Sequence, residues 1–109
     1  KEYNAFIVPE PNPVGYLKAT MIKDEMEIIS FVIDKNYRKK GIGKALLNKI
    51  LLIAANKKIS SIFLEVSVEN NIAINLYKKA NFLKVGERKN YYSLNGRKVN
   101  AYIMKLNLS

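Results

Sequence analysis

The stretch Arg38-Lys39-Lys40-Gly41-Ile42-Gly43-Lys44-Ala45 lies between an apolar run and a strongly amphipathic segment. Its glycines allow the backbone to approach a ligand closely, and the first N–H groups of a helix have no partner within that helix. The positive end of the helix dipole also favours an anion. The stretch therefore predicts a phosphate site at the start of a helix. In the alternative interpretation, the glycines only permit a turn and the lysines only face solvent.

Two familiar phosphate motifs do not fit this stretch. Gly43-Lys44-Ala45 lacks the upstream glycine spacing of a P-loop and the Ser or Thr that would hold magnesium. Leu46 stands where a dinucleotide-binding fingerprint would have its third glycine. The stretch is therefore neither of these motifs.

After the glycines, apolar residues recur at spacings of three and four, at Ile42, Leu46, Ile50, Ile53 and Ala54. This period predicts an amphipathic helix. Before the glycines, residues 14–23 and 26–33 are strand-like and flank Asp24-Glu25, which predicts a hairpin. An earlier strand is expected at residues 5–8 and ends at Pro9, because proline cannot donate to a ladder.

The second half of the chain continues with a strand, a helix and two strands. Alternating apolar residues predict a strand over 62–66, and a helix follows over about 72–80. Asn70 or Asn71 can cap this helix, and Asn81 can end it in the left-handed conformation. Strands at 82–89 and 99–106 are expected to join around Asn95-Gly96. This order predicts one α+β domain over residues 1–109, with a mixed sheet and helices packed against it.

The composition limits the chemistry. The formal net charge is +10, which favours a polyanionic partner. Lysine is far more abundant than arginine, as an AT-rich coding sequence would produce, so direct nucleic-acid binding is not expected. The absence of cysteine and histidine excludes disulfides and the usual zinc sites and triads, and no metal is expected. No apolar run approaches the roughly 18 residues of a membrane span, and no signal peptide is evident, so we expect a cytoplasmic chain without a membrane anchor.

The pattern Arg38-x-x-Gly41-x-Gly43, placed between strand and helix, resembles the pyrophosphate signature of the GNAT acetyltransferases. The resemblance covers about residues 26–106. Residues 63–82 and the run Lys89-Asn90-Tyr91-Tyr92 are similar to the ribosomal-protein-alanine N-acetyltransferases, the RimI type. The resemblance implies the GNAT fold, with a mixed, largely antiparallel sheet flanked by helices, and acetyl-CoA as cosubstrate. Family domains usually begin with a strand and one or two helices, which we expect to be missing here.

The resemblance also implies roles for particular residues. Phe31, Val32 and Ile33 would pair through their backbone with the pantetheine arm, as a strand edge accepts an added strand. Backbone amides of residues 39–44 would bind the pyrophosphate, and Asn70 would hydrogen-bond the cofactor near the thioester unless it is only a helix cap. The expected cofactor-binding set is therefore Phe31, Val32, Ile33, Arg38, Lys39, Lys40, Gly41, Ile42, Gly43, Lys44 and Asn70.

Glu65 interrupts an otherwise apolar strand, so it either lies at a strand end in solvent or has a function. The resemblance makes Glu65 the general base for the acceptor ammonium, directly or through water. Tyr77 either packs in the core or, as the resemblance implies, acts as the general acid on the departing CoA thiolate. A phenol is a weak acid for a thiol, so hydrogen bonding to sulfur would carry part of that effect.

Tyr91 and Tyr92 are expected to line the entry for a peptide N-terminus, because aromatic walls bury a side chain without demanding one sequence. The leading prediction is acetyl transfer to a protein N-terminal α-amine, with an Ala-type ribosomal protein as target. Two alternatives stay open: an acetyltransferase for a small amine or a lysine, and a non-catalytic basic module that binds the ribosome or RNA.

Overall fold

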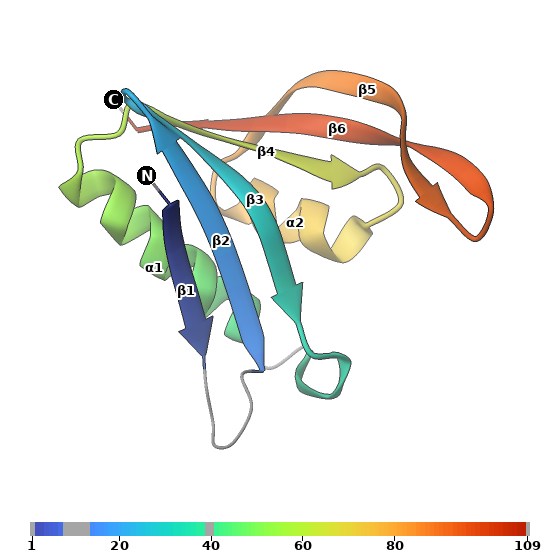
Figure 1. The fold of residues 1–109 in the computed structure, drawn as a ribbon, viewed down its shortest axis with the longest axis horizontal. Helices are drawn as coiled ribbons and strands as arrows, with labels where there is room; N and C mark the ends of the chain where they lie inside the picture. Colours follow the sequence, from blue (N-terminus) through green and yellow to red (C-terminus); the bar gives the residue numbers. More distant parts are fainter. Residues whose placement is uncertain (1, 8–13, 39–40, 109) are drawn as a thin grey trace.

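The computed structural model describes residues 2–7 by their backbone, and residues 14–38 and 41–108 with side chains. Within these ranges, six strands form one mixed sheet in the order β1-β2-β3-β4-β6-β5 (Figure 1). The strands are β1 (Glu2–Ile7), β2 (Gly15–Ile22), β3 (Glu25–Ile33), β4 (Ser61–Ser67), β5 (Leu83–Leu94) and β6 (Arg97–Asn107). The helices are α1 (Ile42–Asn56) and α2 (Asn71–Lys79), with a short 3-10 helix η1 (Lys35–Tyr37) before α1. The expected α+β class and order of elements are confirmed.

The sheet opens between β3 and β4. These two strands pair in parallel only from Glu25 opposite Ser61 to Ile28 opposite Leu64, whereas all other neighbours are antiparallel. An irregularity follows at once, because Lys18 pairs with Ser30 and Ala19 with Ile28, so Ile29 is an extra residue in β3. Such a bulge bends its strand. Beyond it, β3 and β4 diverge, as Figure 1 shows, and α2 lies at the opening.

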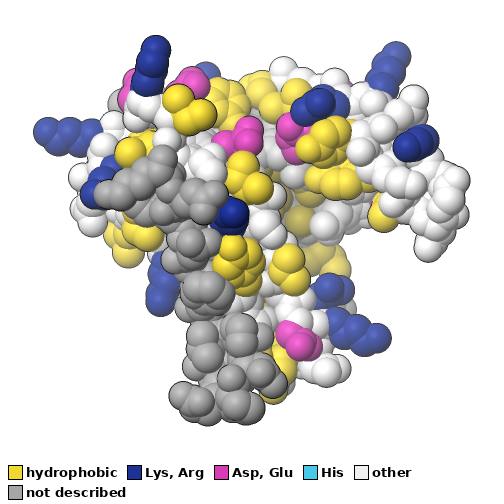
Figure 2. Space-filling model, in the orientation of Figure 1, with side chains coloured by type: hydrophobic (Ala, Val, Ile, Leu, Met, Phe, Trp, Pro, Cys, Tyr) yellow, Lys and Arg dark blue, Asp and Glu magenta, His cyan; other side chains and the backbone are white. Residues whose placement is uncertain are grey.

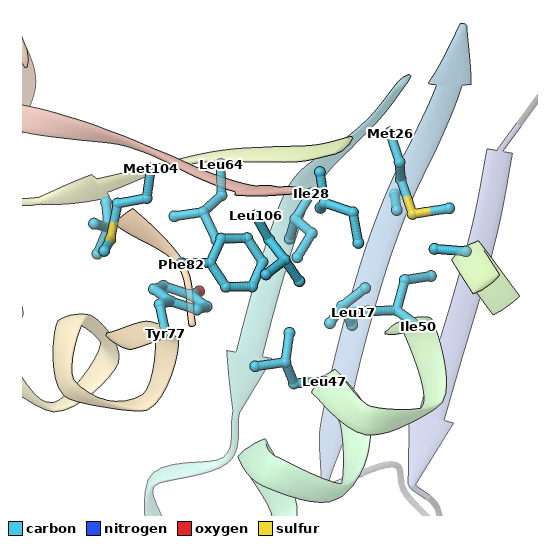
Figure 3. Packing of buried hydrophobic residues seen from close by; sticks show 14 of the residues in the cluster. Leu17, Met26, Ile28, Leu47, Ile50, Leu64, Tyr77, Phe82, Met104 and Leu106 are labelled. Atoms are coloured by element: carbon cyan, nitrogen blue, oxygen red, sulfur yellow. The ribbon is translucent and has the colours of Figure 1, made fainter. Parts of the chain in front are cut away.

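Both helices pack on one face of the sheet. Alternate strand residues such as Leu17, Met26 and Leu64 face α1 and α2 and form the buried core. Figure 3 shows these side chains meeting Leu47 of α1, with the rings of Tyr77 and Phe82 beside them. Burial of each large apolar side chain contributes about 1.5–3 kcal/mol, which fixes the helices on the sheet. The β4 residues that alternate with the buried ones, including Glu65, point to the opposite face of the sheet. No helix of the described chain covers that face.

The turns use the residues that their backbone angles require. Asn95 and Gly96 have φ of 51° and 79° in the turn between β5 and β6, and Asn81 has φ of 74° after α2. Asn70 is the N-cap of α2, with its Oδ1 accepting from the Ala73 N–H at 3.2 Å. These turns and the cap agree with the sequence predictions.

Several predicted boundaries need adjustment. The turn between β2 and β3 consists of Lys23 and Asp24, because Glu25 already pairs with Ile22. Lys23 adopts a φ of 57°, which supplies the sharp reversal. The strand predicted at 5–8 begins at Glu2, and Val8 to Pro13 lie outside the described residues. Strands β5 and β6 continue up to the turn, so Tyr91 and Tyr92 lie within a strand.

The excess of basic side chains is spread over the surface. Lys44 and Lys49 are exposed on α1, and Lys57 and Lys58 are exposed directly after it. On the face drawn in Figure 2, lysine and arginine side chains lie around the outline of the molecule, with acidic side chains between them. The described side chains on this face therefore form no continuous basic stripe of the kind that a nucleic-acid groove requires.

Candidate active site

A cavity of about 470 Å³, here called the α1 hollow, lies between the end of β3, the start of α1 and one side of α2. Gly41 is the N-cap of α1 and has a φ of 77°, a left-handed conformation that favours glycine. It offers no side-chain cap, so the first N–H groups of the helix have no partner within it. The lining residues are Phe31, Val32, Ile33, Tyr37, Arg38, Gly41, Ile42, Gly43, Lys44, Asn70, Ile72, Ala73, Leu76 and Tyr77.

Gly43 keeps the α1 hollow open. A Cβ at this position would lie 3.4 Å from Leu76 Cδ2 and 4.0 Å from Phe31 Cζ, and both of those side chains line the hollow. Any side chain larger than that of alanine would therefore extend into the space between α1 and α2. The absence of a side chain here suits a ligand that contacts the helix start through backbone atoms.

Three polar contacts fix the chain between β3 and α1, two to residues outside this connection and one within it. Arg38 Nε donates to the Ile33 carbonyl at 3.2 Å, and the Asp34 N–H donates to the Val14 carbonyl at 2.8 Å. Asp34 Oδ1 also accepts from the Asn36 N–H at 2.9 Å and caps η1. Arg38 therefore borders the hollow while it fixes the connection. Lys39 and Lys40, predicted to contribute amides, lie outside the described residues.

A second cavity of about 690 Å³, here called the β4 hollow, lies between the diverging parts of β3 and β4. It is lined by Ile28, Ile29, Ser30, Phe31, Val32, Arg38, Leu64, Glu65, Val66, Ser67, Glu69, Asn70, Ala73, Tyr77, Tyr92 and Leu94. The two hollows share six lining residues: Phe31, Val32, Arg38, Asn70, Ala73 and Tyr77. They therefore meet at the opening of the sheet, and Tyr77 borders both.

Glu65 is not at a strand end in solvent. It faces the β4 hollow, and its side chain is 22% exposed. Arg88 Nη1 donates to both carboxylate oxygens, at 3.0 Å to Oε1 and 3.3 Å to Oε2. The Tyr92 hydroxyl donates to the Glu65 backbone carbonyl at 3.3 Å. Arg88 of β5 thus orients the carboxylate, and this pairing is not evident from the sequence.

Tyr77 packs in the core and also borders both hollows. Its ring centroid lies 6.1 Å from that of Phe31 and 5.7 Å from that of Phe82 (Figure 3). Burial raises the pKa of the Tyr77 phenol well above its ordinary value, and the nearby Tyr92 adds to this effect. The hydroxyl therefore stays protonated at neutral pH, so it is available as a hydrogen-bond donor and is a reluctant proton donor.

The two adjacent tyrosines have different surroundings. The pairing of β5 with β6 is irregular between Arg88 and Tyr92, and Asn90 has a φ of 56° there. Tyr92 is half-buried and lines the β4 hollow, whereas Tyr91 is exposed and is not among its lining residues. The two rings meet edge to face at 4.9 Å. The Arg88 guanidinium carbon lies 4.5 Å from the centre of the Tyr91 ring.

A second ion pair joins the β5–β6 hairpin to the rim of the β4 hollow. Arg97 Nη1 and Nη2 donate to the two carboxylate oxygens of Glu69, each at 2.7 Å. This pairing lowers the pKa of the Glu69 carboxyl below its ordinary value. Both side chains are largely exposed, so the pair orients the hairpin more than it stabilises the fold.

The described residues offer neither a metal-binding cluster nor a membrane-spanning helix. No cluster of three His, Cys, Asp or Glu side chains that could hold a metal ion occurs in that part of the chain. None of its helices is long and apolar enough to cross a membrane.

Residues 2–82 match the model of the acetyltransferase (GNAT) family, and the chain belongs to this family. It is 30% identical over 89 residues to the [ribosomal protein bS18]-alanine N-acetyltransferase of Escherichia coli K12, with 82% of this chain and 60% of that protein covered. It is also 34% identical over 96 residues to ML0378 of Mycobacterium leprae, an uncharacterized protein of which it covers 25%.

A crystal structure of the ribosomal-protein-S18-alanine N-acetyltransferase from Escherichia coli matches the fold with a TM-score of 0.93. The match is 26% identical and covers 99% of this chain and 70% of that one. The predicted similarity to the ribosomal-protein-alanine type is confirmed. The chain nevertheless spans only 60% and 25% of the lengths of the two curated relatives above.

Proposed function

We propose that this chain transfers an acetyl group from acetyl-CoA to the N-terminal α-amine of a protein. The observation that carries the proposal is the meeting of two hollows at the opening between β3 and β4. One hollow offers the backbone N–H groups of a helix start, and the other offers a carboxylate. Membership of the acetyltransferase (GNAT) family supports this assignment of donor and acceptor sides.

On the donor side, backbone groups of Gly41, Ile42, Gly43 and Lys44 would bind the pyrophosphate. A side chain larger than alanine at Gly43 would extend between Leu76 and Phe31, so the glycine at this position supports this fit. The β4-side edge of β3 is unpaired beyond Ile28, so residues 31–33 can accept the pantetheine arm as an added strand. Asn70 uses its Oδ1 to cap α2, which leaves its amide NH₂ as a donor toward the cofactor.

On the acceptor side, Glu65 would take a proton from the substrate ammonium, directly or through water. An α-ammonium titrates near pH 8, so only a modest base is required. The free amine then attacks the thioester carbon, the carbon–sulfur bond breaks, and the proton that the attacking nitrogen gives up passes to the departing CoA thiolate, so that CoA leaves as the thiol. Tyr77 would donate a hydrogen bond to this sulfur. No covalent enzyme intermediate is needed, which accords with a chain that has no cysteine or histidine.

The walls of the β4 hollow favour a peptide acceptor over a small amine. Ile29, Val32 and Leu94 are exposed apolar residues that line it together with Tyr92. Such walls would bury the first side chain of a peptide, and the Tyr92 hydroxyl, which donates to the Glu65 carbonyl, would accept a hydrogen bond from a peptide N–H. The Escherichia coli relative acts on bS18, so we propose a ribosomal protein beginning with alanine as the target, acetylated in the cytoplasm.

The test is acetylation of a peptide that begins with alanine and contains one internal lysine, read by mass spectrometry that locates the acetyl group. A matched peptide with a blocked N-terminus is the control. We expect acetyl only on the α-amine and no reaction of the blocked peptide. Transfer to lysine of the blocked peptide at a comparable rate would contradict the α-amine assignment. Salt-sensitive RNA binding without affinity for acetyl-CoA would instead favour a basic RNA-associated module.

A further inference from the structure

Arg88 contacts Glu65 without lining either hollow. Its Nη1 donates to both oxygens of the Glu65 carboxylate, and within the described residues Glu65 is the carboxylate with which Arg88 pairs. Arg88 comes from β5, two strands away from β4 in the sheet. It therefore reaches the carboxylate from β5, outside the set of residues that line the β4 hollow.

The sheet register explains this placement. Arg88 pairs with Ala101 of β6, and Ala101 pairs with Ser67 of β4. Residues that pair across strands share a face, so Arg88 stands on the same uncovered face as Ser67 and its alternate neighbour Glu65. Ala101 is fully buried, and its small side chain leaves room for Arg88 to reach across β6.

Arg88 is itself supported from the outside. Its guanidinium lies over the exposed Tyr91 ring at 4.5 Å, a cation–π arrangement. The turn of backbone that presents Tyr91 is fixed by Asn100, whose Oδ1 accepts from the Asn90 N–H at 3.0 Å. A chain of contacts thus runs from Tyr91 through Arg88 to Glu65.

The pairing leaves Glu65 able to act on a substrate. A single nitrogen of Arg88 serves both oxygens, so the arrangement is not the two-nitrogen fork that Arg97 forms with Glu69. A carboxylate has about four lone-pair sites, and one donor nitrogen leaves acceptor capacity toward the β4 hollow. The contact therefore orients the carboxylate without occupying it fully.

We propose that Arg88 is a positioning residue for acetyl transfer: it aims the Glu65 carboxylate at the acceptor amine, and Tyr91 holds Arg88 in place. The inference rests on the proposed function, because it acts through Glu65 as base. Displacement of a catalytic group by about 1 Å can cost up to about 100-fold in rate. Loss of Arg88 would thus lower kcat for the acceptor and leave KM for acetyl-CoA nearly unchanged.

The test compares Arg88→Met and Arg88→Lys with Lys105→Met, which removes another cation from the same sheet face, 5.3 Å from the Phe63 ring. We expect Arg88→Met to lower kcat for the alanine peptide about 10- to 100-fold, with KM for acetyl-CoA and Tm unchanged. Arg88→Lys should recover part of this loss, and Lys105→Met should match the wild type. Tyr91→Leu should lower kcat more than Tyr91→Phe, which keeps the aromatic face.

A double variant decides whether Arg88 acts through Glu65. In a Glu65→Gln background, Arg88→Met should cause little further loss of kcat, because the group that it positions is gone. Full additivity of the two losses, or a wild-type kcat in Arg88→Met, would overturn the inference. If Arg88→Met has no effect while Glu65→Gln is nearly inactive, the inference fails and the proposed function stands. If the wild type does not acetylate the peptide at all, the proposed function itself fails.

Discussion

The α1 hollow and the β4 hollow meet at Tyr77 but are lined by different kinds of chemical group. The α1 hollow is lined by two glycines, apolar side chains and a few polar ones such as Arg38 and Lys44, but by no carboxylate among the described residues. The β4 hollow contains two carboxylates, Glu65 and Glu69, and each is paired with an arginine from the β5–β6 hairpin. A site of backbone groups can serve one unvarying ligand, whereas a site of paired side chains can change its acceptor by substitution.

The comparison predicts that loss of one carboxylate of the β4 hollow is far more damaging than loss of the other. Glu65→Gln should lower kcat by roughly 10²- to 10⁴-fold, because the acceptor ammonium loses its base, while acetyl-CoA affinity stays nearly intact. Glu69→Gln is the matched control and should lower kcat only a few-fold. Steady-state kinetics with the alanine peptide measure both. Glu65→Gln should be partly rescued at alkaline pH, where the amine is already neutral.

In the α1 hollow, Gly43→Val should weaken acetyl-CoA binding by roughly 10- to 100-fold, because the valine methyl groups would overfill the space beside Leu76 and Phe31. Gly43→Ala is the control, since its Cβ would make an ordinary contact. Lys44→Ala should have a smaller effect that salt suppresses. Isothermal titration with acetyl-CoA measures all three. Equal affinity of Gly43→Val and the wild type would mean that the α1 hollow does not bind the cofactor.

The adjacent tyrosines should separate binding from positioning. Tyr92→Ala should raise KM for the alanine peptide about 10-fold, because Tyr92 lines the β4 hollow and contacts the Glu65 backbone. Tyr91→Ala should change that KM less and lower kcat instead, because Tyr91 contacts Arg88. KM for acetyl-CoA should stay constant in both. Identical kinetic changes in the two variants would show that the pair acts as one aromatic wall.

The same contrast explains what could be predicted from the sequence. Gly41 and Asn70 were identified because a helix start depends on residues within one turn, and Asn95-Gly96 because a tight turn is equally local. Glu65 was noticed because a carboxylate is unexpected in an apolar strand. These signals need no knowledge of distant neighbours.

The features that the sequence analysis missed are not local. Arg88 reaches Glu65 only through two successive strand registers, β5 with β6 and β6 with β4. The opening of the sheet depends on one extra residue in β3, Ile29, which looks like any other apolar strand residue. Basic side chains are common in this sequence, so neither Arg88 nor Arg97 carried a signal of its own. Their partners become evident only once the hairpin is placed.

The smallest predicted effect tests whether Tyr77 belongs to the packed core or to the open β4 hollow. Burial raises the pKa of Tyr77, so the folded protein keeps this proton at pH values where the unfolded chain, with a phenol pKa near 10, releases it. The stability from buried neutral Tyr77 is therefore complete below pH 10 and declines above it. At pH 10.5 the loss should be about 0.8 kcal/mol, measured by urea unfolding.

Tyr77→Phe has no such proton, so its stability should fall less steeply between pH 9 and 10.5. The other ionisable groups are common to both proteins, so the difference between the two pH profiles reports on the Tyr77 hydroxyl. If the two proteins lose stability in parallel, the hydroxyl is solvated in the folded state. It would then belong to the β4 hollow, where it could donate a proton to the departing thiolate as well as a hydrogen bond.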